Sequence, residues 1–151
     1  MLRKIEINNF KSFEHAEFDL KNFTLLAGRN SMGKTSVIQA IFAMIQNGKN
    51  PFRGEYMNIG KVQEVKNAIT GNGDIEFKIC YKTSEKEIEA SKVITKEGVS
   101  ESGEIDKLIN VIYCSSDRIG IEDTYKKYLG DKIIIGKNCE YVFHYLNAHD
   151  E

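Results

Sequence analysis

One stretch of eight residues, from Gly28 to Thr35, carries the clearest chemistry in this sequence. It reads G-x-x-x-x-G-K-T, the pattern of a loop whose backbone N–H groups point at the phosphates of a nucleotide. The glycines permit backbone angles that other residues rarely adopt. In such a loop Lys34 reaches the outer phosphates and the hydroxyl of Thr35 ligates Mg²⁺. The candidate phosphate-binding residues are Gly28, Arg29, Asn30, Ser31, Met32, Gly33, Lys34, Thr35 and Ser36.

The residues on either side of this loop match the context that the motif requires. Residues 23–27 form a short apolar run typical of a buried strand, and a helical pattern extends from Lys34 to about Gln46. The start of that helix would add partial positive charge at the phosphates. Gly48 is the predicted stop. The predicted buried face comprises Val37, Ile38, Ile41, Met44 and Ile45, with Ser36, Gln39 and Gln46 on the other side.

The rest of the chain reads as short strands and helices. Alternating residues around Ile5–Ile7 and 16–20 predict two half-buried strands joined by residues 9–13, and residues 75–81 and 86–95 predict a second hairpin. An interior strand is expected at 108–114 and another at 133–135, and helices at 62–69, 122–129 and 140–148. Loops are expected at 48–60, which holds the only proline, at 96–107, and at the polar turn 115–120.

Length and composition narrow the classes of function. A chain of 151 residues suits one domain that buries roughly two-thirds of its unfolded surface. The net charge of -1 provides no overall basic field for nucleic acid. Cys80, Cys114 and Cys139 form no C-x-x-C pair, so neither a disulfide framework nor a zinc site is indicated, and a reducing cytoplasm is expected. The first residues lack a signal-peptide pattern and no apolar run is long enough to span a membrane.

Four segments together resemble a known family: Asn9–Phe13 (N-F-K-S-F), the loop G-x-N-x-x-G-K-T, Tyr56–Gly60 and Ser115–Gly120. They look like the N-terminal lobe of bacterial AAA family ATPases of the ABC-type, SMC/RecF-like class. Overcoming-lysogenization-defect nucleases and several phage-defence ATPases are similar. The resemblance implies an α/β P-loop fold, with a mixed sheet and an antiparallel β subdomain, over residues 1–151 as a single nucleotide-binding lobe.

The resemblance also assigns roles to individual residues. It implies ATP and Mg²⁺ as the bound species, and Asn30 is typical of ABC-type loops, whereas Met32 departs from the small residue usual there. Lys11 matches a family position close to the nucleotide; a solvated hairpin lysine is the alternative. Gln46 and Gln63 are candidates for the family's Mg²⁺-sensing glutamine, although surface polarity explains both equally well.

Two motifs that complete such an ATPase are missing from the sequence. No Leu-Ser-Gly-Gly run occurs, and the one candidate for the acidic strand end is Asp117, which Arg118 follows where the family has Glu. The chain is therefore expected to be half of an ATPase that needs a homodimer partner or a complementing lobe, with its catalytic residues unidentified. DNA maintenance or phage defence are the roles that the resemblance implies.

Two other classes of function stay open. One is a complete small P-loop enzyme that uses Asp117, which is otherwise an ordinary turn carboxylate. The other is an interaction or regulatory module with an empty site. Tyr125–Tyr128 interleaves aromatic and lysine side chains, which suits either nucleic-acid stacking or an amphipathic helix with its tyrosines packed inward. His15, His144 and His149 show no metal-binding spacing.

Overall fold

The computed structural model describes residues 1–54, 57–71, 73–84, 86–104, 113, 127, 129 and 140–148. The chain divides into two compact units, Met1–Ile109 and Asn110–Glu151. In the second unit the described element is helix α3 (Val142–Ala148), which confirms the helix predicted at 140–148. The elements predicted at 108–114, 115–120, 122–129 and 133–135 lie outside the described residues, as does Asp117. A single lobe over 1–151 stays a prediction.

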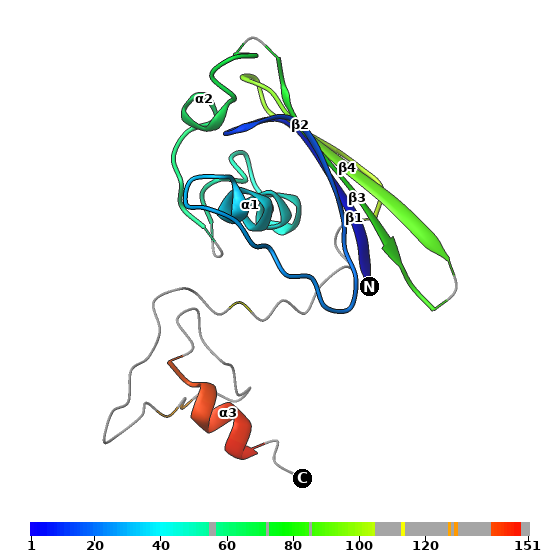
Figure 1. Cartoon of the computed structure of the whole chain (residues 1–151), viewed down its shortest axis with the longest axis vertical. Coiled ribbons are helices and arrows are strands. Elements are labelled where there is room, and N and C mark those ends of the chain that lie inside the picture. Colours follow the sequence, from blue (N-terminus) through cyan, green and yellow to red (C-terminus); the bar gives the residue numbers. More distant parts are fainter. Residues whose placement is uncertain are drawn as a thin grey trace. The chain divides into compact units, whose positions relative to one another are not determined.

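The first unit contains an antiparallel sheet in the order β2-β1-β3-β4-β5 (Figure 1). Its strands are β1 (Leu2–Phe10), β2 (Phe13–Asp19), β3 (Ile75–Lys82), β4 (Glu87–Ile94) and β5 (Val99–Ser102). Both predicted hairpins are confirmed, and the β1–β3 pairing joins them into one sheet. The prediction of a loop over 96–107 is wrong at β5. β5 has four residues and one apolar side chain, so it shows no alternation of apolar and polar residues from which a strand could be predicted. It is a strand because its backbone pairs with β4.

Helix α1 (Lys34–Ile45) lies along one face of the sheet (Figure 1). It begins where the sequence predicted, but Gln46 already has extended backbone angles, so the helix ends before Gly48. The predicted buried face is partly wrong, since Ile38 is 38% exposed. Ala40 is at the centre of the packed face, and Ile38 lies about 200° around the helix from it. Ile38 is therefore on the opposite side of the helix. The buried residues of α1 are Ser36, Val37, Ala40, Phe42, Ala43 and Met44.

The surface excursion predicted at residues 48–60 is only partly present: Gly48, Lys49 and Arg53 are exposed, but Pro51, Phe52 and Met57 are buried. Phe52 is fully buried, and its ring stacks on that of Phe10 with centroids 5.5 Å apart. Phe77 from β3 meets Phe10 edge to face at 5.1 Å. Burying an aromatic ring removes about 150–250 Å² of surface from water, so Phe52 enters the core although turn residues surround it.

The buried strand predicted at residues 23–27 is also wrong. These residues belong to no strand, and Phe23 and Leu25 are 83% and 75% exposed. An extended segment becomes a strand only where a neighbouring backbone offers hydrogen bonds. None of the described strands pairs with residues 23–27. The apolar composition of residues 23–27 therefore predicted a buried strand, but no strand of the described sheet pairs with these residues.

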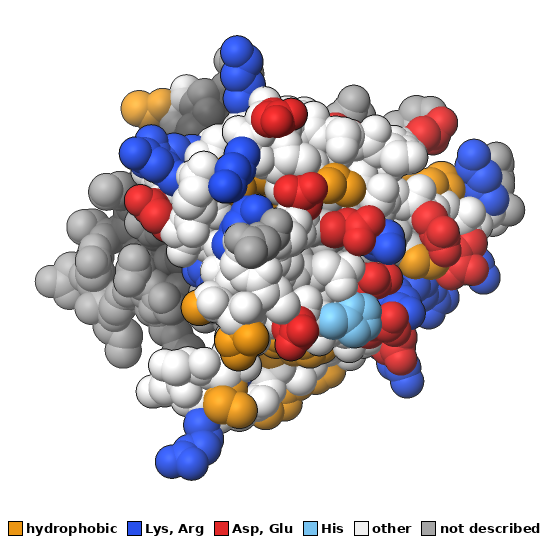
Figure 2. All heavy atoms as spheres, turned by 90° about the horizontal axis from the view of Figure 1, so that it is seen from above, with side chains coloured by type: hydrophobic (Ala, Val, Ile, Leu, Met, Phe, Trp, Pro, Cys, Tyr) orange, Lys and Arg blue, Asp and Glu red, His pale blue; other side chains and the backbone are white. Residues whose placement is uncertain are grey.

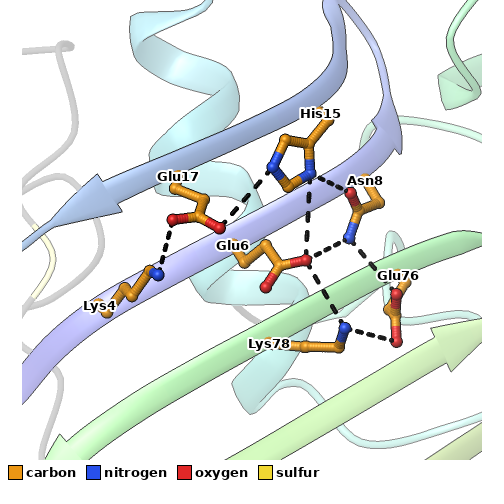
Figure 3. Close-up of polar contacts among 7 residues, drawn as sticks. All are labelled: Lys4, Glu6, Asn8, His15, Glu17, Glu76 and Lys78. Carbon is orange, nitrogen blue, oxygen red and sulfur yellow. Dashed lines mark hydrogen bonds and ion pairs between the residues drawn. The ribbon is translucent and has the colours of Figure 1, made fainter.

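The face of the sheet opposite α1 carries a polar network (Figure 3). The Lys4 ammonium lies 2.6 Å from the Glu17 carboxylate, and Lys78 lies 3.6 Å from Glu6. Asn8 donates to Glu6 at 2.9 Å, and this bond, helped by the charge of Lys78, lowers the pKa of Glu6. Acidic and basic side chains are interspersed on the face seen in Figure 2. The outer side of the sheet thus carries paired charges of both signs.

Lys92 on β4 provides a test of how the sheet holds the end of α1. Its side chain is fully buried, and its ammonium donates to the Gln46 carbonyl at 2.8 Å and contacts the Glu101 carboxylate at 2.8 Å. Replacing Lys92 by Met keeps the apolar stem but removes the buried hydrogen bond to the Gln46 carbonyl and the ion pair with Glu101, so we expect the free energy of unfolding to fall by about 1–3 kcal/mol.

Urea unfolding of the Lys92→Met variant measures this loss. Lys78→Met is the matched control, because Lys78 also contacts carboxylates but its side chain is 48% exposed. Surface ion pairs contribute little to stability, so the control should change the unfolding midpoint less. Equal effects of the two substitutions would show that the buried Lys92 contacts stabilise the fold no more than the exposed ion pairs of Lys78 do.

Candidate nucleotide-binding site

A cavity of about 440 Å³ opens where the β1–β2 turn meets the glycine loop and the first turn of α1. All of its lining residues except Ser12 were candidates from the sequence. Gly28, Arg29 and Met32 do not line it, and neither do Gln46 and Gln63. The lining residues are Lys11, Ser12, Asn30, Ser31, Gly33, Lys34, Thr35 and Ser36.

The backbone of the loop has the left-handed angles that its glycines predicted. Gly28 has φ 146°, Gly33 has φ 87°, and Ser31 also has a positive φ of 64°. Gly33 is the N-cap of α1 and supplies no side chain to the helix end. The first N–H groups of a helix have no partner within the helix. No described residue accepts a hydrogen bond from the N–H groups of Lys34, Thr35 and Ser36, which line the cavity at the positive end of the helix dipole.

Lys34 turns back over the start of the loop. Its ammonium donates to the carbonyl oxygens of Gly28 and Arg29, both at 2.7 Å. Gly28 and Arg29 therefore contribute to the site through their carbonyls, as holders of the lysine. Met32 is 68% exposed, so the unusual large side chain at this position points to solvent and leaves the cavity open.

Lys11 reaches the same cavity from the turn between β1 and β2. Its ammonium donates to the side-chain oxygen of Gln39 on α1 at 2.7 Å and lies 5.8 Å from the centre of the Phe10 ring. Partial burial lowers the pKa of Lys11. Lys11 is therefore not a freely solvated hairpin lysine but lines the cavity; its position close to a nucleotide stays a prediction. Gln39 was missed, because its one sequence signal is a polar residue on the exposed side of a helix.

The charges in this cavity differ from those in a larger hollow elsewhere. A hollow of about 490 Å³ on the outer face of the sheet is lined by lysines and carboxylates together. Lys4 and Lys78 there contact Glu17, Glu6 and Glu76 (Figure 3). Lys11 and Lys34, in contrast, contact neutral oxygens, and no described carboxylate pairs with either. Two uncompensated cations beside free N–H groups suit an anionic ligand.

Thr35 and Ser36, in the first turn of α1, bring their hydroxyl oxygens to the cavity as candidate ligands for Mg²⁺. Gln46 lies at the other end of α1, about 16 Å along the helix from Thr35 at 1.5 Å per residue, and its side-chain amide bonds Pro51 and Met57. Gln63 is exposed on helix α2 (Val62–Val65), which is shorter than the helix predicted at 62–69. The structure brings neither glutamine to the cavity.

The donor set at the cavity fits Mg²⁺ held mainly by a nucleotide. No group of three His, Cys, Asp or Glu side chains suited to a metal occurs in the part of the chain that the structure describes. Mg²⁺ in nucleotide sites takes one or two protein oxygens, water and the substrate phosphates. A single Thr35 hydroxyl matches that requirement. Cys80 is no nucleophile at neutral pH, since burial and the Glu87 carboxylate raise its thiol pKa to about 11.

A glycine loop with lysines at a helix start is the arrangement by which proteins commonly bind phosphate groups. Over residues 1–151 the sequence matches the model of the AAA ATPase domain family. The chain belongs to this family of ATPases, which confirms the resemblance at the level of AAA family ATPases. No curated protein matches the chain. Among the helices described here, none has the length and apolar character to cross a membrane.

Gly33 tests the contact between the loop and the β1–β2 turn. A Cβ at this position would lie 2.6 Å from Cζ of Phe13 and 2.9 Å from Oγ of Ser12, and the backbone φ is positive. We therefore expect Gly33→Ala to lower the free energy of unfolding by about 1–3 kcal/mol, measured by urea denaturation. Gly98→Ala, where nothing lies within 4 Å, is the control. An unchanged midpoint in Gly33→Ala would contradict the close contact.

Proposed function

We propose that this chain is the nucleotide-binding lobe of an ABC-type ATPase of the SMC/RecF-like class, with a P-loop fold that binds ATP and Mg²⁺. Membership of the AAA ATPase domain family supports ATP as the nucleotide. One observation carries the proposal: two lysines without carboxylate partners line a cavity formed by a glycine loop and the start of a helix. A polyphosphate supplies the negative charge that this cavity lacks.

Each part of the cavity has a role toward the triphosphate. The N–H groups of the loop and of the first turn of α1 cradle the phosphates. Lys34 exchanges the carbonyls of Gly28 and Arg29 for phosphate oxygens, which are better acceptors because they are charged. Lys11 leaves Gln39 in the same way. Thr35 holds Mg²⁺, which when bound screens the phosphate charge.

Hydrolysis requires groups that the described residues do not bring to this cavity. None of its described lining residues is Asp, Glu or His, so none of them can activate a water molecule as a base. We propose that a second copy of the chain or a complementing ATPase lobe closes over the outer phosphate and supplies those groups. A cytoplasmic role in DNA maintenance or phage defence is the process that the resemblance implies for such an assembly.

ATP binding by the isolated chain tests the proposal. Calorimetry with ATP and Mg²⁺ should show binding by the wild type and at least tenfold weaker binding by Lys34→Ala, because a hydrogen bond between charged groups contributes about 1.5–3 kcal/mol. Lys49→Ala is the control, since Lys49 is exposed and does not line the cavity. Absence of binding at millimolar ATP would overturn the proposal and favour an interaction module.

Turnover distinguishes a half-site from a complete enzyme. We expect the chain alone to bind ATP without efficient hydrolysis. The release of inorganic phosphate at saturating ATP measures the rate. Hydrolysis at rates typical of ATPases, abolished by both Lys34→Ala and Asp117→Asn, would contradict the half-site and favour a complete small P-loop enzyme.

A further inference from the structure

The segment after α2 packs against the turn that presents Lys11. The Lys11 N–H donates to the Val65 carbonyl at 2.8 Å, and the Asn67 N–H donates to the Asn9 carbonyl at 3.2 Å. Phe10 and Lys66 form an antiparallel bridge between these two bonds. Residues 65–67 therefore extend the pairing of β1 at the end that faces the cavity, although 56 residues separate Asn67 from Lys11.

The side chain of Asn67 joins three backbone groups. It is 4% exposed, and its amide nitrogen donates to the Lys11 carbonyl at 2.8 Å. Its amide oxygen accepts the N–H groups of Ile69 at 2.8 Å and Thr70 at 3.1 Å. One end of the amide thus shapes the turn at 67–70, and the other end holds the main chain at Lys11.

Lys11 needs such a contact because its backbone angles are unfavourable. Its φ of 51° lies in the left-handed region, where a side chain with a Cβ is destabilised and persists only if the surroundings hold it. Asn9, two residues earlier, has φ 54° and accepts a hydrogen bond from the Thr70 hydroxyl at 2.6 Å. Asn9, near the end of β1, and Lys11, in the turn, are therefore both held by the segment from 65 to 70.

We propose that Asn67 is a positioning residue of the nucleotide site that acts through Lys11. The inference rests on the proposed function, since it assumes that Lys11 contacts the phosphates. Without the bond from Asn67, the peptide that follows Lys11 is free to rotate and Lys11 relaxes to an ordinary φ. The lysine side chain then leaves the direction that carries its ammonium to the cavity.

The Asn67→Asp variant separates the two ends of this amide. Asp keeps the oxygen that accepts from Ile69 and Thr70, but it replaces the donor to Lys11 by an oxygen. We expect calorimetry to show about three- to tenfold weaker binding of ATP and Mg²⁺, the effect of one lost hydrogen bond. Asn67→Ser, which is uncharged and too short to reach the Lys11 carbonyl, should weaken binding similarly and serves if the Asp variant fails to fold.

Asn50→Asp is the matched control. Asn50 also donates its amide to a backbone carbonyl, that of Gly60 at 3.2 Å, and accepts a backbone N–H, that of Phe52 at 3.0 Å. It does not contact Lys11, so ATP affinity should be unchanged. Circular dichroism of each variant verifies that it is folded before its ATP affinity is compared with that of the unmodified protein.

A double-mutant cycle decides whether Asn67 acts through Lys11. In a Lys11→Ala background, the uncharged Asn67→Ser substitution should weaken ATP binding no further, because the group that Asn67 positions is gone. The same loss in both backgrounds would overturn the proposal, as would wild-type affinity in the single Asn67 variants. Absence of ATP binding by the unmodified protein is a different result, since it overturns the proposed function and this inference together.

Discussion

The close approach of the β1–β2 turn to Gly33 is the constraint on which the rest of this structure depends. The ring of Phe13 and the hydroxyl of Ser12 occupy the space where any other residue would carry a Cβ. This contact joins the antiparallel sheet to the loop and to the start of α1. It places the Lys11 side chain beside Lys34, so a lysine from a hairpin and a lysine from a helix line one cavity.

The opposite end of α1 is held by different means. Gln46 accepts the Met57 N–H and donates to Pro51 through its side chain, and its carbonyl accepts from the buried Lys92. The aromatic rings of Phe10, Phe52 and Phe77 fill the space between the helix, the sheet and residues 48–60. Because interiors are closely packed, a helix held at both ends presents its first turn, and the phosphate loop before it, in a defined position.

Part of this fold was predictable because it depends on local pattern. The hairpins of β1–β2 and β3–β4 follow from alternating apolar residues, and the start of α1 follows from the glycine loop. The errors arose where a partner decides the structure. Residues 23–27 have the apolar composition of a strand, but no described strand pairs with them. β5 lacks that composition, but it pairs with β4. Phe52 is buried among turn residues because a cluster of aromatic rings surrounds it.

The sequence by itself determined the glycine loop, the lysine and hydroxyl within it, and the helix that begins behind them, because those features need only residues adjacent in the chain. The tertiary structure alone decided that Lys11 lines the same cavity, that Gln39 and Asn67 hold its two ends, and that Gln46 lies away from it. Each of these contacts joins residues of different elements. No spacing within a single element encodes which surfaces of the sheet, the helix and the segment after α2 come together.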